Sequence, residues 1–250
     1  MVQLKSLAEI EKMRQAGAIV AQVLKEIEEL VKPGSTTFDL DLFAQTRTKE
    51  LGAKPAFKGY QGFPATLCVS VNEEVVHGIP SKKRILKDGD IVGIDFGVIL
   101  DGWYGDSART FPVGKVSEEA SKLLEITEKS LFLGIEQAVA GNHLFDIGHA
   151  VQNFVESYGY SVVREFVGHG IGKNLHEDPQ VPNFGIKGKG MLLKPGMVLA
   201  IEPMINAGKP AVKVLADGWT AITADKKLSA HFEHTIAITE KGNEILTKVL

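Results

Sequence analysis

The chain has 250 residues, of which 44% are hydrophobic and 24% charged, a composition typical of a soluble globular protein. The formal net charge of −3 gives no electrostatic reason to expect nucleic-acid binding, and no run approaches the roughly 18 consecutive apolar residues of a membrane span. One cysteine, Cys68, excludes an internal disulfide framework and, with an N-terminus unlike a signal peptide, favours the reducing cytoplasm.

Two helices are predicted first along the chain. A Ser6-Leu7-Ala8-Glu9 capping box predicts a helix whose apolar face continues to Val31, before Lys32-Pro33-Gly34 ends it. A second helix is expected from Thr37 to Leu51. The following segments are a Gly/Pro-rich loop over 55–64 and short β-rich runs over about 65–112, within which we interpret the basic run at 82–84 as a solvated turn.

The same order of elements then starts again. Ser117 opens a helical pattern that runs to about Ala140, a shorter helix is predicted over about 146–158, and β-rich segments continue from about 160 to 238. Two helices followed by strands, twice, predict an α+β protein. We expect one domain, residues 1–250, made of related halves at about 1–112 and 113–250.

An internal repeat supports related halves. The segment from Leu86 to Asp95 aligns without gaps on that from Leu193 to Glu202, and upstream His77-Gly-Ile-Pro matches His169-Gly-Ile-Gly. The spacing from histidine to acid is longer in the second copy, which indicates an insertion around residues 173–192. Duplication would place Asp95 and Glu202 on opposite sides of a shared cleft.

Two aspartates in the strand-like stretch 91–111 are predicted to share one face. Asp101-Gly102 is a strong two-residue hairpin signal. With this turn, Gly97 faces Asp106 across the hairpin and Asp95 faces Ala108, so the two aspartates become diagonal neighbours with β-carbons ~7 Å apart or less. Gly97 between them leaves space for one or two cations.

Two further acids, Glu202 and Glu233, also sit in apolar surroundings. Isolated buried carboxylates cost many kcal/mol, and Arg109, the nearest cationic candidate, cannot balance four acids. Two divalent ions can. His169, flanked by glycines that allow close backbone approach, would be a fifth ligand, and an oxygen-rich set with one histidine favours Mn²⁺, Fe²⁺ or Co²⁺.

Together these residues resemble those of the type I methionine aminopeptidases over essentially the whole chain. The segments that carry the resemblance are NEEVVHGIP (72–80), GIDFGVILDGWYGDSARTF (93–111), GHGIGKNLHEDP (168–179), AIEPM (200–204) and FEHT (232–235). The resemblance implies the pseudo-symmetric "pita-bread" fold around a metal pair. It also implies that Asp95, Asp106, His169, Glu202 and Glu233 are metal ligands, with Asp106 and Glu233 bridging both ions.

The activity implied by the resemblance is hydrolytic removal of the N-terminal methionine. A metal-bridged hydroxide would attack the first peptide carbonyl, with Glu202 as the general base. His77 and His176 would contact the scissile amide and the tetrahedral oxyanion. An alanine at either histidine is expected to lower turnover while metal content stays nearly intact.

The methionine side chain requires an apolar pocket. By family position its walls would be Tyr60, Phe63, Cys68, Leu175 and Trp219, with His77 at the rim. A small second substrate residue is expected from the family. Phe57-Lys58 departs from the usual pattern, and His231 stands where the family usually has Gln, on the face of Glu233. We interpret the remaining histidines, His143, His149 and His234, as structural or exposed.

The expected partners are the N-termini of nascent polypeptides, near the ribosome, with the enzyme acting as a cytoplasmic monomer. Two alternatives stay open at this point. One is a proline-specific peptidase of the same fold, of the aminopeptidase P or prolidase type. The other is a relative that binds peptides without cleaving them, although such relatives lose metal ligands and all five are present here.

Overall fold

The computed structural model describes residues 2–248. The helices are α1 (Leu7–Glu28), α2 (Thr37–Glu50), α3 (Glu118–Gln137) and α4 (Leu144–Ser157), with a 3₁₀ turn at Tyr60–Gly62. The strands of the first part are β1 (Lys54–Pro55), β2 (Leu67–Val71), β3 (Glu74–Val76), β4 (Ile91–Leu100) and β5 (Trp103–Pro112). Those of the second part are β6 (Ser161–Val162), β7 (Gly168–Gly170), β8 (Glu177–Val181), β9 (Val198–Ile201), β10 (Met204–Asn206), β11 (Val212–Val214), β12 (Ala221–Thr223), β13 (Ser229–His231), β14 (His234–Thr239) and β15 (Gly242–Ile245).

The predicted α+β order is confirmed, with two helices before each set of strands. The Ser6–Glu9 capping box is present: the Ser6 hydroxyl accepts from the Glu9 N–H, and the Glu9 carboxylate accepts from the Ser6 N–H. Helix α1 ends at Glu28, three residues before Val31, and a turn follows at Glu29 and Leu30. The basic run at 82–84 lies in a turn with Lys82 and Lys83 exposed, as predicted.

The fourth helix begins two residues earlier than predicted. His143 occupies its N-cap, a position that Ser, Thr, Asp or Asn usually takes, and its backbone N–H donates to the Asp146 carboxylate at 2.8 Å. The sequence lacked the usual cap residue, so the start was misplaced. The β-rich region also extends past the predicted end at 238, because β15 pairs with β14 as a final hairpin.

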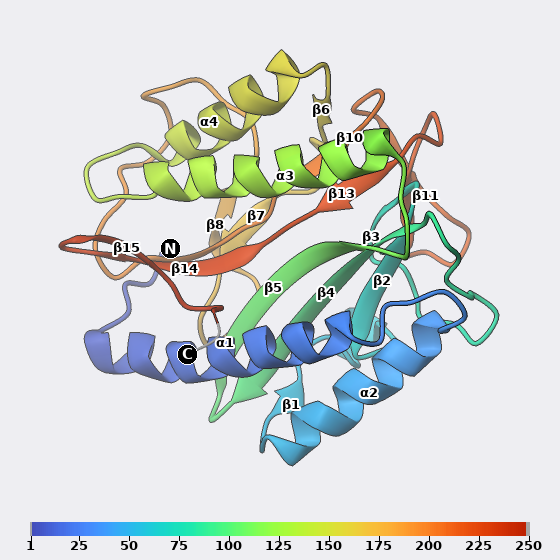
Figure 1. Cartoon of the computed structure of the whole chain (residues 1–250). Helices are drawn as coiled ribbons and strands as arrows, with labels where there is room; N and C mark the ends of the chain where they lie inside the picture. Colours follow the sequence, from blue (N-terminus) through green and yellow to red (C-terminus); the bar gives the residue numbers. More distant parts are fainter. Residues whose placement is uncertain (1, 249–250) are drawn as a thin grey trace.

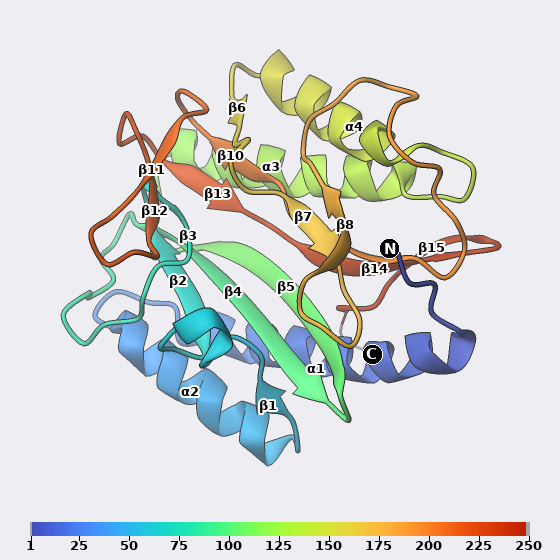
Figure 2. The same ribbon diagram turned by 180° about the vertical axis from the view of Figure 1, so that it is seen from behind.

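All four helices lie on the same side of the strands. In Figure 1, α1 and α2 lie in the lower part of the view and α3 and α4 in the upper part. Figure 2 shows the molecule from behind, with the strands β2, β4, β5 and β7 towards the viewer. One buried core joins α1 and α2 to β2, β4 and β5, and another joins α3 and α4 to strands of the second part. The predicted division at about residue 112 falls at the end of β5. None of the helices within residues 2–248 is long and apolar enough to cross a bilayer.

The predicted hairpin register is confirmed along its whole length. Leu100 pairs with Trp103 around the Asp101-Gly102 turn, Gly97 pairs with Asp106, and Asp95 pairs with Ala108. The two aspartates therefore share the face predicted from the turn. The second part repeats this plan with separate strands, since β9 pairs with β14 in antiparallel fashion.

Hydroxyl side chains join the two parts between β5 and the chain at 231–235. The Thr235 hydroxyl donates to the Asp106 carbonyl at 2.7 Å and accepts from the Asp106 N–H at 3.2 Å. The Thr110 hydroxyl makes the same double contact with the backbone of His231, and Ser107 donates to the Glu233 carbonyl. These bonds fix β5 against the segment that carries Glu233.

Helix α1 lies so close to β5 that Gly105 cannot carry a side chain. A Cβ at Gly105 would lie 2.8 Å from the Gly17 nitrogen, a backbone atom. We expect Gly105→Ala to lower the free energy of unfolding by about 1–3 kcal/mol, because α1 must shift away from the strand. Urea unfolding measures the change. Gly93→Ala on the neighbouring strand is the matched control, since its Cβ would have its nearest contact at 3.5 Å, from the Thr110 hydroxyl. Equal stability of the two variants would contradict this packing.

Candidate metal centre and substrate cleft

Each part of the chain brings two carboxylates to the centre from a pair of antiparallel strands. Asp95 lies in the middle of β4 and Asp106 in β5. Glu202 directly follows β9 and Glu233 directly precedes β14, just beyond the paired residues Ile201 and His234. The sequence repeat had matched Asp95 with Glu202, and the two occupy corresponding strands.

His169 lies in β7, next to β9, and faces these acids. Its Nε2 atom is 3.6 Å from Glu202 Oε1 and 4.0 Å from Asp106 Oδ2. One ligand atom from each of Asp106, His169 and Glu233 lies within 4.8 Å of the others. All five residues predicted as ligands line one cleft of about 200 Å³.

The acids strongly perturb one another. Burial raises the pKa of Asp95 to about 7 and that of Glu202 to about 8. Burial, together with repulsion from the neighbouring carboxylates, raises the pKa values of Asp106 and Glu233 well above their usual range. The four groups therefore resist carrying four negative charges without cations.

The ring of His169 has a defined tautomer. Its Nδ1–H donates to the Gly170 carbonyl at 2.9 Å, which leaves Nε2 with a lone pair directed at the acids. Burial lowers its pKa to about 3, so the imidazole is neutral at physiological pH. A Cβ at Gly168 or Gly170 would lie 2.3 or 2.1 Å from a backbone oxygen, so the close approach expected of the flanking glycines is confirmed.

The donor set fits divalent cations. Asp95 Oδ1, Asp106 Oδ1 and Glu233 Oε1 are buried, and among the described residues none of the three has a hydrogen-bond partner. Buried polar atoms are rarely left unpaired. Arg109 does not balance them, because it is half-exposed and lies 3.4 Å from Glu28. Cations between these carboxylates and His169 Nε2 would satisfy every one of these atoms.

Gly97 keeps the space between the aspartates open, as predicted. A Cβ there would lie 2.8 Å from Phe57 Cε1 and 3.2 Å from Asp106 Oδ1. Any side chain would push the Asp106 carboxylate out of place. Phe57 itself lies in the wall of the cleft.

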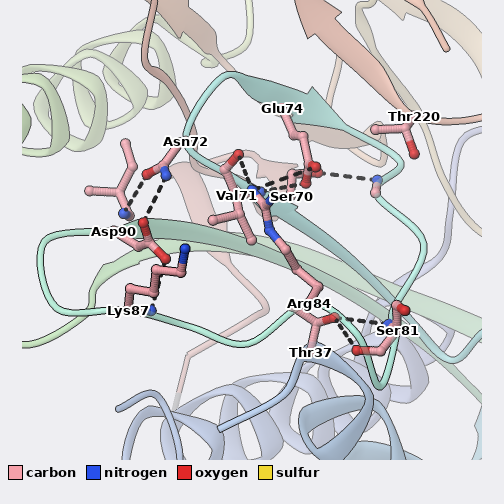
Figure 3. Close-up of polar contacts among 12 residues, drawn as sticks. Thr37, Ser70, Val71, Asn72, Glu74, Ser81, Arg84, Lys87, Asp90 and Thr220 are labelled. Atoms are coloured by element: carbon pink, nitrogen blue, oxygen red, sulfur yellow. Dashed lines mark hydrogen bonds and ion pairs between the residues drawn. The ribbon is translucent and has the colours of Figure 1, made fainter. Parts of the chain in front are cut away.

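His77 is held rigidly at the edge of the cleft. It has a left-handed φ of 62°, which is strained for a residue with a side chain. The next residue, Gly78, donates its N–H to the Ser70 hydroxyl at 3.2 Å. Further along, the Ser81 N–H bonds to Thr37, and the Arg84 guanidinium lies 3.8 Å from the Glu74 carboxylate (Figure 3). The segment from His77 to Arg84 is therefore held by contacts near both of its ends.

His176 faces the centre from the loop after β7. Its ring lies edge-on to His169 with a 4.3 Å centroid separation, and its Nδ1 lies 2.7 Å from the Tyr60 hydroxyl. Burial lowers the pKa of His176. His77 and His176 both line the same cleft as the acids. Burial also lowers the pKa of His77, to about 4, so both imidazoles are neutral at pH 7.

Most residues predicted for the apolar pocket line the cleft: Tyr60, Cys68, Leu175, Trp219 and His77. Phe63 is not in the lining and instead supports Trp219 from behind, with ring centroids 5.1 Å apart. The Cys68 thiol is buried beside Asp95. Burial, together with the negative charges of Asp95 and Asp106, raises the pKa of this thiol well above its usual range. Cys68 is therefore an uncharged residue in the wall of the cleft.

Five lining residues were not predicted: Gln61, Val76, Phe166, Val167 and Met204. Phe166 packs edge-on against His77 at 5.3 Å. The sequence offered one signal for Phe166, namely its position three residues before His169. Val76 and Met204 lie at strand ends, Val167 directly precedes β7, and Gln61 lies in the 3₁₀ turn, so the direction of each side chain depends on tertiary packing.

The remaining histidines divide as expected in part. His231 does reach the site, with Nε2 3.6 Å from Glu202 Oε2. His143 caps α4, and His149 contacts Asn153 and Gly185 at the surface of that helix. His234 is only partly buried, and its Nδ1 lies 2.9 Å from the Thr247 hydroxyl.

Comparisons with known proteins identify the family of this chain. The model of metallopeptidase family M24 matches residues 11–240. Methionine aminopeptidase 1 of Bacillus subtilis is 56% identical over 249 residues, covering 100% of both chains. The crystal structure of the methionine aminopeptidase of Thermotoga maritima has a TM-score of 0.98 at 49% identity and covers 99% of this chain and 100% of its own. The prolidase of Pyrococcus horikoshii has a TM-score of 0.79 at 27% identity, and only 64% of its chain is covered.

The raised carboxyl pKa values predict how the metal-free protein responds to pH. Above about pH 7.5 the histidines are largely neutral in both the folded and the unfolded state, so the carboxyls dominate the pH dependence. The folded state keeps Asp95 and Glu202 protonated up to about pH 7 and 8, whereas the unfolded chain does not. The folded state binds more protons, so its stability falls as pH rises, by about 1.4 kcal/mol per pH unit for each carboxyl still protonated.

Urea unfolding of chelator-treated protein between pH 7.5 and 8.5 measures this slope. Asp106→Asn should reduce it, since one of the mutually repelling carboxyls is gone. A stability that stays flat or rises with pH would contradict the assignment.

Proposed function

The chain belongs to metallopeptidase family M24 and has its pita-bread fold, and we propose that it is a metalloaminopeptidase that removes the N-terminal methionine from polypeptides. The observation that supports this most directly is the convergence of four buried carboxylates and one neutral imidazole on a cleft with an apolar wall. A hydrolase that acts on N-terminal methionine requires both parts.

We propose two divalent ions, of Co²⁺, Mn²⁺ or Fe²⁺, held by Asp95, Asp106, His169, Glu202 and Glu233. Two ions neutralise four carboxylates, and the oxygen-rich set with one nitrogen suits these metals. Asp106 and Glu233 would be the carboxylates shared between the ions. Both are fully buried at the centre of the acidic cluster, and each has an oxygen without a hydrogen-bond partner among the described residues, as Asp95 also has.

Metal ions held by these residues would lower the pKa of a water towards neutrality and would polarise the peptide carbonyl. Glu202 would act as the general base, accepting a proton from the attacking water and returning it to the leaving amine. Its raised pKa, about 8 without metal, marks a carboxylate that takes up a proton readily in this environment. His77 and His176 contact the scissile amide and the developing oxyanion.

The methionine side chain is proposed to lie against Tyr60, Cys68, Leu175 and Trp219, with Phe63 supporting the tryptophan. Phe57 and Phe166 extend this apolar surface beside His77. A small second residue is preferred, because the metal ligands and His77 crowd the exit from the pocket.

The proposed substrates in the cell are nascent polypeptides near the ribosome in the cytoplasm. The single cysteine is a free thiol, which suits a reducing compartment. We propose that the enzyme acts as a monomer, because the cleft of a single chain already brings together all five proposed ligands.

A proline-specific peptidase is the rival with the same fold. Its relatives are less similar to this chain, as the 27% identity to the prolidase against 56% to the Bacillus subtilis enzyme indicates. A non-catalytic relative is not favoured, because the complete set of predicted ligands lines one cleft.

A substrate panel tests the proposed reaction. Metal-stripped protein is assayed on peptides that begin Met-Ala, Met-Lys and Ala-Pro, with and without Mn²⁺, Fe²⁺ or Co²⁺. We expect metal-dependent release of methionine from the Met-Ala peptide alone. Cleavage only before proline, or none with any metal, would refute the proposal.

Alanine substitutions separate the two histidines from the ligands. We expect His77→Ala and His176→Ala each to lower kcat by about 10²–10⁴-fold, with metal content close to that of the wild type by elemental analysis. His169→Ala is the comparison variant, expected to lose metal as well as activity. Loss of metal in a His77 or His176 variant would instead make that residue a ligand.

A further inference from the structure

His231 is a buried histidine beside the candidate metal centre that the proposed reaction has not yet used. Its side chain is 4% exposed, and its Nε2 atom lacks a hydrogen-bond partner among residues 2–248. That atom lies 3.6 Å from Glu202 Oε2. A buried ring nitrogen without a partner calls for an explanation.

The backbone of His231 is fixed from both sides. Its N–H donates to the Thr110 hydroxyl at 2.9 Å, and its carbonyl accepts from the same hydroxyl at 2.8 Å. In the β10–β13 pairing it lies opposite Met204, two residues after Glu202. The ring therefore has a set position relative to the Glu202 carboxylate, and that position comes from β5 and β10 together.

Glu202 lies between two imidazoles with different roles. On the Oε1 side, His169 presents a lone pair, because its proton is on Nδ1 and bonds to Gly170. A lone pair and a carboxylate oxygen repel unless a cation lies between them. On the Oε2 side, the Nε2 of His231 is free to carry a proton and donate it.

Within residues 2–248, no other side chain or backbone group orients this carboxylate. Of the residues that the structure describes, none donates a hydrogen bond to either side-chain oxygen of Glu202; its contact with Asn183 uses the backbone carbonyl. The 3.6 Å separation from His231 is slightly beyond a hydrogen bond, and a small rotation of the glutamate closes it. Contacts in unliganded active sites are often long in this way.

We propose that His231 is a positioning residue whose Nε2–H donates to Glu202 Oε2 and directs Oε1 towards His169 and the metal site. The inference rests on the proposed function, and it assigns a task to a residue that differs from the glutamine usual in the family. An amide could donate the same bond, so the chain keeps the donor while changing the side chain.

Three variants test the proposal: His231→Leu, which removes the donor at similar size, His231→Gln, which keeps one, and His149→Leu, a surface control on α4. Two quantities are measured for each. The first is the affinity of the metal-free protein for Co²⁺, followed by its visible absorption, and the second is kcat and KM on a Met-Ala peptide.

We expect His231→Leu to weaken Co²⁺ binding and to lower kcat, each about tenfold or more, with KM nearly unchanged. His231→Gln should restore both to near the wild-type values, and His149→Leu should change neither. Wild-type kcat and Co²⁺ affinity in the leucine variant would overturn the proposal. So would a rise in KM alone, which would indicate substrate contact, or an equal loss in the glutamine variant, which would indicate packing.

The two measurements separate this proposal from the proposed function. A wild type that releases no methionine from the peptide refutes the proposed function. The Co²⁺ titrations of the three variants still decide whether His231 orients Glu202.

Discussion

Repulsion among four buried carboxylates is the constraint on which the rest of this structure depends. Asp95, Asp106, Glu202 and Glu233 lie in one cleft, and burial raises the pKa of every one of them. A fold would not concentrate such groups without a compensating charge. The arrangement therefore implies cations as part of the native site, and the neutral His169 completes a set that binds them.

The acids can meet only because the two parts of the chain are held in register. Hydroxyls of Ser107, Thr110 and Thr235 bond to backbone groups across the junction between β5 and residues 231–235. These bonds involve the backbone of Asp106 and Glu233 themselves. The same junction fixes the backbone of His231, so the orientation proposed for Glu202 and the joining of the two parts would share one structural cause.

The surroundings of the charged centre divide into a polar floor and an apolar wall. Glycines permit the close contacts at the floor: Gly97 leaves room for Asp106, and Gly170 lets His169 approach β8. Aromatic side chains form the wall, where Trp219 packs on Phe63 and Phe166 packs on His77. A dry pocket next to a strong electrostatic centre suits a reaction that binds an apolar side chain and hydrolyses the adjacent amide.

The sequence by itself determined the local features. The Asp101-Gly102 turn fixed the register of β4 and β5 and the common face of Asp95 and Asp106, because strand side chains alternate strictly. The repeat and the motif order identified the four acids and the one histidine that converge. Only the tertiary structure decided which side chains line the cleft, such as Phe166 and Met204, and which stand behind it, such as Phe63. It also decided that His231 meets Glu202. Those contacts join residues far apart in the chain, and their geometry depends on how two helix-backed sheets pack, which no local pattern encodes.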